Sequence, residues 1–275
     1  MEPFGHRLAA ATKARGSVCV GIDPHAALLQ AWGLSDDVDG LRRFTDACVE
    51  AFAGTAGVVK PQSAFFERFG SVGIAVLEKA IVDLRAAGVL VLLDVKRGDI
   101  GSTMAAYAEA YLSSSAPMAV DAITVSPYLG VGSLDPAFDV ANANGAGLFV
   151  LALTSNPEGP QFQHARVGDG RLVAQTVIDE VAQRNSDDEW GSFGVVVGAT
   201  IGDVEVDFAA LHGPLLVPGI GAQGGNDDDV KRLFADVLPH VLPSVSREVL
   251  KAGPDVVALR AAVSQQVDSF AFLQS

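Results

Sequence analysis

Cysteine is scarce in this sequence. Only two occur among the 275 residues, Cys19 in an apolar, strand-like run and Cys48 in a helix-like one. Neither belongs to a CxxC pair or a Cys/His cluster, so the sequence argues against a disulfide framework and against structural zinc. We expect both cysteines to be buried, reduced thiols.

Basic charge and long apolar runs are also lacking. The chain has 19 Lys and Arg against 33 Asp and Glu, and this formal net charge of −14 argues against a nucleic acid partner. The strongest apolar run, at 147–153, is too short to span a bilayer, and residues 1–16 lack the basic start and apolar core of a secretory signal. We therefore expect a cytoplasmic protein with no membrane partner. A small anionic metabolite stays compatible, because a local basic pocket can oppose the overall charge.

Hydrophobic residues make up 49% of the chain and fall in eight short runs separated by longer amphipathic stretches. Such near-continuous hydrophobicity is typical of strands in a buried parallel sheet. The expected strands are 17–23, 57–62, 88–96, 121–127, 147–154, 193–200, 214–220 and 241–247. The expected helices are 38–52, 72–88, 102–114, 172–184, 203–211, 227–236 and 254–270.

The number of these repeats decides between two α/β folds. Eight strand–helix units in one domain, residues 1–275, predict a (β/α)8 TIM barrel, a closed parallel sheet surrounded by helices. An open, doubly wound sheet is the alternative.

Charged residues gather where the expected strands end, and in barrels catalytic groups lie at these carboxyl ends. They are Asp23 in the first strand, Lys60 in the second, Asp94 and Lys96 in the third, and Asp99 in the loop that follows. Asp94 and Lys96, two positions apart, point to the same side of their strand at a separation of about 6–7 Å. Buried charges are costly unless paired, so this cluster is either a catalytic array or a structural ion-pair network that caps the barrel.

Three roles are open to Lys96. A Schiff base requires a neutral amine, which an apolar pocket or a second cation favours. Asp94 and Asp99 are near in sequence and favour the ammonium form instead. This argues for a general acid that donates a proton to a developing carbanion. Phosphate binding is the third role.

A Gly-rich turn and an arginine predict a phosphate site. The turn, VPGIGAQGGND (217–227), follows the seventh expected strand, and its backbone N–H groups can approach an oxyanion closely. Arg247 follows the eighth strand, where a guanidinium can bind phosphate through two hydrogen bonds. Phosphate sites in these barrels commonly use the loops after strands seven and eight. The alternative for Arg247 is a solvated residue at a helix start.

The segment DVKRGDIGST (94–103) resembles the D-x-K-x-x-D signature of orotidine 5'-phosphate decarboxylases, and the chain is most similar to the longer bacterial branch of that family. The signature alone is shared with related sugar-phosphate enzymes. Further segments in the same order and spacing extend the resemblance over most of the chain: GIDP (21–24), VKPQSAFFERFG (59–70), TVSPYLG (124–130), LTSNP (153–157), VVGAT (196–200), VPGIGAQGG (217–225) and SVSR (244–247).

The resemblance implies decarboxylation of orotidine 5'-phosphate to uridine 5'-phosphate (UMP) in pyrimidine biosynthesis, without cofactor or metal. An alternating charged array would carry the reaction, with Lys96 protonating C6 of the pyrimidine; its members would be Lys60, Asp94, Lys96 and Asp99. The chain would form a homodimer, in which each subunit's Asp99, with Ile100 and Thr103, reaches into the partner's site.

The resemblance also implies the substrate contacts. Asp23 and Lys60 would hold the ribose hydroxyls, and Ser126 would hydrogen-bond the pyrimidine. Gln223 and Arg247 would bind the phosphate.

Two other functions are open on the residues alone. A magnesium-dependent decarboxylase or aldolase for a sugar phosphate would share Asp94 and Lys96 but needs further carboxylates around the metal. Glu67 is a candidate ligand, although its place at a helix start suits a capping role better. A non-catalytic barrel that binds a nucleotide phosphate would gain nothing from burying a Lys/Asp array. A spectroscopic assay with orotidine 5'-phosphate distinguishes all three.

Overall fold

Eight parallel strands close into a barrel in the computed structural model, which describes residues 1–185, 189–202, 205–221 and 224–274. Strands that are neighbours in sequence pair with one another, and β1 pairs with β8 through Cys19↔Ser244 and Val20↔Val245. The predicted TIM barrel is therefore confirmed, and the open-sheet alternative, which leaves these two strands apart, is wrong. The strands are β1 (Cys19–Ile22), β2 (Val58–Pro61), β3 (Leu90–Arg97), β4 (Ala122–Val125), β5 (Gly147–Leu153), β6 (Phe193–Val197), β7 (Leu215–Val217) and β8 (Val241–Val245).

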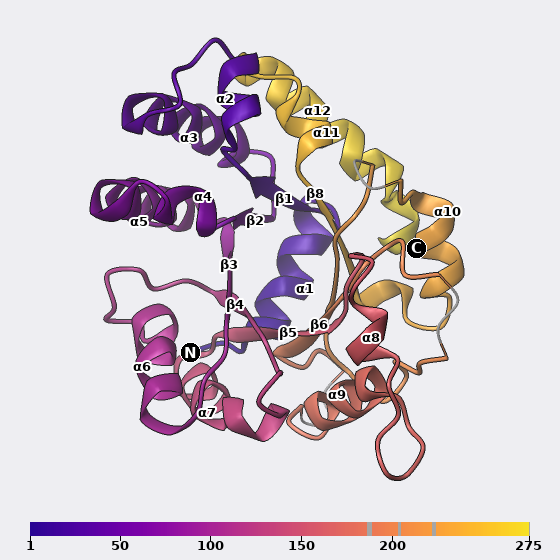
Figure 1. Ribbon diagram of the computed structural model, residues 1–275. Helices are drawn as coiled ribbons and strands as arrows, with labels where there is room; N and C mark the ends of the chain where they lie inside the picture. The colour runs from indigo at the N-terminus through magenta and orange to yellow at the C-terminus, as the bar shows by residue number, and fades with distance from the viewer. Residues whose placement is uncertain (186–188, 203–204, 222–223, 275) are drawn as a thin grey trace.

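Helices form the outer ring of the barrel (Figure 1), and six of the seven expected helical stretches contain one. The helices are α1 (Phe4–Arg15), α2 (Ala26–Ala31), α3 (Val38–Phe52), α4 (Ala64–Glu67), α5 (Gly70–Ala86), α6 (Gly101–Leu112), α7 (Asp135–Asn144), α8 (Pro160–Gln163), α9 (Val173–Ala182), α10 (Asp227–Leu233), α11 (Arg247–Leu250) and α12 (Val256–Ser269). Three short 3-10 helices are η1 (Val131–Leu134), η2 (Leu238–His240) and η3 (Ala271–Gln274).

The expected helix at 203–211 is wrong over its described part, residues 205–211. Asp207 organises a turn there instead. Its carboxylate accepts a hydrogen bond from the Ala209 N–H (2.8 Å), and its own N–H donates to the side chain of Gln175 on α9 (2.7 Å). Aspartate offers the backbone such local bonds in competition with a helix, which explains the difference.

Hydrophobic cores lie on both faces of the sheet. The larger one fills the space between the strands and the surrounding helices, and a smaller one fills the barrel interior. Cys48 belongs to the first and Cys19 to the second; both are free and buried, as expected. Within the described ranges, no helix combines the length and the hydrophobicity that a bilayer crossing requires.

The helix α1 closes the amino-terminal end of the barrel. Phe4 is fully buried, and its ring meets Phe149 of β5 edge-on at a centroid distance of 6.0 Å. Gly147 makes room for that ring, since a Cβ there would lie 2.2 Å from a Phe4 ring carbon. Arg7 adds a hydrogen bond to the buried carboxylate of Asp121. The opposite end, where the strands finish, is left open for a site.

Replacing Phe4 by alanine should lower the free energy of unfolding by about 3–5 kcal/mol, because the lost ring leaves a cavity below the barrel. Phe162→Ala is the matched control. Phe162 is 56% exposed on α8, so the same truncation should cost less than about 1 kcal/mol. Urea denaturation followed by circular dichroism measures both, and equal losses would contradict the closing role of α1.

Candidate active site

A cavity of about 400 Å3 opens at the carboxyl ends of the strands. A second cavity, of about 140 Å3, adjoins it, because Lys60 and Pro218 line both. The larger one is lined from β2 through β7 by Lys60, Asp94, Lys96, Thr124, Leu151, Thr154, Ser155, Asn156, Val196, Thr200, Leu216 and Pro218. The smaller one is lined by Asp23, Lys60, Ser244, Ser246, Arg247 and the turn Pro218, Gly219 and Ile220.

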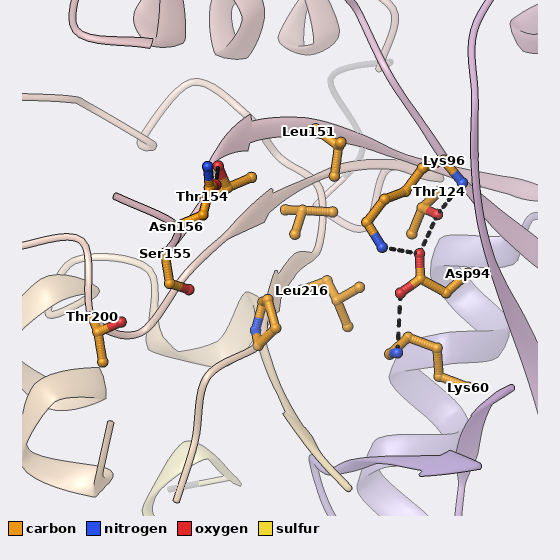
Figure 2. A pocket seen from close by; sticks show the side chains of 12 residues that line it. Lys60, Asp94, Lys96, Thr124, Leu151, Thr154, Ser155, Asn156, Thr200 and Leu216 are labelled. Atoms are coloured by element: carbon orange, nitrogen blue, oxygen red, sulfur yellow. Dashed lines mark hydrogen bonds and ion pairs between the residues drawn. The ribbon is translucent and has the colours of Figure 1, made fainter. Parts of the chain in front are cut away.

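A charged array forms one side of the larger cavity (Figure 2). Asp94 stands at its centre: one carboxylate oxygen accepts from Lys60 Nζ at 3.2 Å, and the other accepts from Lys96 Nζ at 2.6 Å. The side chains of Lys60 and Asp94 are only 8% and 9% exposed, whereas that of Lys96 is 47% exposed. The structure thus places together three of the four residues expected in the array.

Burial and charge act in opposite directions on this array. Burial disfavours the Asp94 carboxylate, but Lys60 and Lys96 outweigh it and lower the pKa of Asp94 from 3.8 to about 2. Burial also disfavours the Lys60 ammonium, but Asp94 and Asp23 reverse that effect and raise the pKa of Lys60 above its ordinary value. Asp94 is therefore a carboxylate at neutral pH, held between two cationic side chains.

Thr124 of β4 joins the array, although the sequence reasoning did not single it out. Its hydroxyl donates to Asp94 Oδ1 at 2.8 Å and accepts from the backbone N–H groups of Val95 and Lys96 at 3.1 and 3.0 Å. In the sequence, Thr124 is one polar residue within the apolar strand β4, and no spacing of charged or polar residues indicates that it belongs to a site.

The far side of the cavity is polar and uncharged (Figure 2). Thr154, Ser155 and Asn156 follow the end of β5 there. Thr154 is held by Gln163 of α8, which accepts from its N–H at 2.9 Å and donates to its hydroxyl at 2.7 Å. The Ser155 hydroxyl forms no hydrogen bond with another described residue. The segment LTSNP (153–157) contains all three residues, whereas the family resemblance implies Ser126 as the pyrimidine contact.

The smaller cavity holds two more of the expected residues. Asp23 Oδ2 accepts from the Ser246 hydroxyl at 2.5 Å, whereas its buried Oδ1 has no partner among the described residues. Arg247 is exposed, and its guanidinium pairs with no described residue, so both groups are available to a ligand. Gln223, the other expected phosphate contact, lies outside the described residues.

Four expected residues, Asp99, Ile100, Thr103 and Ser126, line neither cavity in this chain. Asp99 accepts from the N–H of Ile100 at 2.8 Å, and it forms no ion pair in the described ranges. Thr103 is exposed on α6, and Ile100 before it is 62% exposed. Ser126 lines neither cavity; its N–H donates to the Arg97 carbonyl at 2.7 Å, which ties the end of β3 to the loop after β4.

Glu67, the candidate metal ligand, instead bonds residues near the start of α4 and the end of β3. It accepts from the hydroxyl of Ser63, the N-cap of α4, at 2.6 Å, and it pairs with Arg97 at 2.8 Å. Among residues that the structure describes, no group of three or more His, Cys, Asp and Glu side chains is arranged to hold a metal ion.

Residues 16–262 match the family described as Orotidine 5'-phosphate decarboxylase / HUMPS. The chain belongs to this family. The orotidine 5'-phosphate decarboxylases of Salinispora arenicola and Streptomyces coelicolor are 64% and 60% identical to it over 266 residues, which cover 96% of each chain. A crystal structure assigned as an orotidine 5'-phosphate decarboxylase of Streptomyces avermitilis is 57% identical, superposes with a TM-score of 0.97, and covers 99% of this chain and 96% of that one.

Membership of the Orotidine 5'-phosphate decarboxylase / HUMPS family confirms the resemblance drawn from residues 94–103 and the segments around them. The family description joins two groups, and these relatives carry the name of the first. The sugar-phosphate and binding-only alternatives are therefore not favoured.

Asp94→Asn should destabilise the protein most at neutral pH, because it removes the carboxylate that is ion-paired with the buried Lys60. The folded-state pKa of Asp94, about 2, lies below the value of 3.8 for a free side chain. This carboxylate therefore stabilises the fold above about pH 4 and loses its contribution as the pH falls toward 2. The stability difference between native protein and Asp94→Asn should shrink by roughly 1 kcal/mol between pH 7 and pH 3.

Urea denaturation at both pH values measures that difference. The control is Asp39→Asn, since the Asp39 side chain is 72% exposed and should change stability little at either pH. A difference for Asp94→Asn that does not depend on pH would contradict the charged state assigned to this carboxylate.

Proposed function

We propose that this chain is a lyase that decarboxylates orotidine 5'-phosphate to UMP in pyrimidine biosynthesis. It acts in the cytoplasm as one catalytic barrel domain, without metal or cofactor. The observation that carries the proposal is the charged array, a carboxylate buried between two cationic side chains at the open end of a barrel of this family. A protein that only bound a nucleotide would gain nothing from this arrangement.

The two adjoining cavities suit the parts of the nucleotide. The pyrimidine occupies the larger one, with its carboxylate toward Asp94, and the ribose and phosphate extend into the smaller one. Asp23 Oδ1 and Lys60 are placed to bind ribose hydroxyls, and the Arg247 guanidinium, which pairs with no residue that the structure describes, binds the phosphate together with Gln223.

Ser155 is better placed than Ser126 to bind the pyrimidine. Its hydroxyl lies in the wall opposite the charged array and is free to bond a ring carbonyl or N–H (Figure 2). Thr154 and Asn156 flank it, and their side chains are already ordered by Gln163 and Glu158.

The reaction breaks the bond between C6 and the carboxylate. The electron pair stays on C6, carbon dioxide leaves, and the Lys96 ammonium gives a proton to C6. Lys96, whose side chain is half exposed, then regains a proton from water. Repulsion between Asp94 and the substrate carboxylate is relieved as carbon dioxide departs, while the cation stabilises charge that develops only in the transition state.

The active unit is a homodimer with shared sites. Asp99, Ile100 and Thr103 lie beyond the end of β3 on an exposed loop and the start of α6, and Asp99 takes no part in the array of its own chain. In a two-fold dimer the same patch is used twice, so each subunit lends its Asp99 to the partner's array.

Purified protein should convert orotidine 5'-phosphate to UMP in the presence of excess chelator, because the Lys96 cation replaces a metal as the electrophilic group. The loss of absorbance of the orotate ring measures the rate. Lys96→Ala should fold normally and lose almost all turnover. Activity that a chelator abolishes and magnesium restores would favour the sugar-phosphate alternative. A substrate adduct trapped on Lys96 by borohydride would show that Lys96 forms a Schiff base and is not the proton donor.

Mixing Lys96→Ala with Asp99→Ala should restore about a quarter of native activity per total site. Half of the randomly assembled dimers are mixed, and each holds one site with neither substitution. The control mixes Lys96→Ala with Lys60→Ala, two residues of the same chain's site, and should restore nothing. If verified mixed dimers of the first pair stay inactive, Asp99 does not cross between subunits.

A further inference from the structure

The pairing of β3 with β4 is interrupted beside the charged array. Leu93 pairs with Ile123, and the next pair along the ladder is Arg97 with Val125. Three residues of β3, including Asp94 and Lys96, therefore face a single residue of β4, Thr124. Such a bulge re-aims side chains, and it also leaves backbone N–H groups without a partner in the ladder.

The Thr124 hydroxyl accepts hydrogen bonds from two of those backbone N–H groups. It accepts from the N–H of Val95 at 3.1 Å and from the N–H of Lys96 at 3.0 Å, inside a strand where Thr124 is only 1% exposed. Lys96 has a backbone φ of +45°, in the left-handed region that a lysine rarely adopts. A strained conformation of this kind persists only where its surroundings hold it, and here the hydroxyl does so.

The same bonds fix the direction of the hydroxyl proton. A threonine hydroxyl has two acceptor positions and one proton, and both acceptor positions are filled by N–H groups. The proton points to Asp94 Oδ1 at 2.8 Å, the oxygen that also accepts from Lys96 Nζ at 2.6 Å. Both bonds are stronger to an ionised oxygen and lower the pKa of Asp94, so Thr124 helps to keep the carboxylate charged and holds it in place.

We propose that Thr124 is a positioning residue for the decarboxylation: one buried hydroxyl holds the Lys96 backbone in its strained conformation and orients Asp94, so that the Lys96 ammonium is aimed at the reacting carbon. The proposal rests on the proposed function. Because its bonding capacity is used up, Thr124 acts through Asp94 and Lys96 and does not bind the substrate.

Thr124→Val and Thr124→Ser test this role. Valine keeps the shape and removes the hydroxyl, so kcat should fall on the order of 10- to 100-fold, as expected for the loss of a charge-assisted hydrogen bond. The KM for orotidine 5'-phosphate should stay within about threefold, since the phosphate and ribose contacts are untouched. Serine keeps the hydroxyl and should retain kcat within about fivefold.

Thr45→Val is the matched control. Thr45 of α3 is also 1% exposed, and among the described residues its hydroxyl bonds the Leu41 carbonyl alone, at 2.7 Å. Losing it should leave kcat unchanged. Rates are referred to the concentration of sites that bind UMP by calorimetry, so that misfolded protein is not counted. If the valine variant fails to fold, Thr124→Cys replaces it with the same expectation, because a thiol fills the space but bonds weakly.

A valine variant with kcat within twofold of native, or equal losses in the valine and serine variants, overturns the proposal. If native protein itself does not decarboxylate the nucleotide, the proposed function fails separately. The coupling of Thr124 to Asp94 is then tested by urea denaturation. The losses in the free energy of unfolding caused by Thr124→Val and Asp94→Asn should be less than additive in the double variant. Full additivity would show that the two residues are not coupled.

Discussion

The pairing of Asp94 with Lys60 and Lys96 is the interaction on which the site depends, because Asp94 and Lys60 are buried and either charge left alone would cost several kcal/mol. The two cations hold the pKa of Asp94 near 2 against the effect of burial. The site therefore keeps a negative charge where a substrate carboxylate would lie and a positive charge where a carbanion would form. Such a field acts on the transition state more than on the bound substrate.

Three adjacent strands of the barrel bring the array together. β2 supplies Lys60, β3 supplies Asp94 and Lys96, and β4 supplies Thr124, while α1 closes the far end of the barrel with Phe4. The bulge in β3 departs from regular strand pairing. In a regular ladder the Lys96 side chain would point in a different direction. The hydroxyl of Thr124 holds the irregular backbone there with three hydrogen bonds, two from backbone N–H groups and one to Asp94.

Periodicity in the sequence was enough to predict the barrel and the positions of Lys60, Asp94 and Lys96, because charge at the ends of apolar runs marks the open end of a parallel barrel. It could not predict Thr124, since a register shift between two strands leaves no trace in the composition of either. The helix α7 was not among the expected helices, because its ten residues bury only Ala137, Phe138 and Ala141 and so give a weak hydrophobic period. Asp99 lines neither cavity of its own chain, and in the proposed dimer its partners belong to a second copy, which one sequence does not place.

Exchange of the C6 hydrogen of UMP in deuterium oxide, followed by proton NMR, tests the central claim most directly, because it is the microscopic reverse of the final protonation. It needs no decarboxylation and reports only on proton transfer between Lys96 and the carbon. The native protein should exchange this hydrogen, while Lys96→Ala and Asp94→Asn, with UMP bound, should exchange it at least about 100-fold more slowly. Exchange in Lys96→Ala as fast as in native protein would contradict the role of Lys96 as the proton donor held by the array.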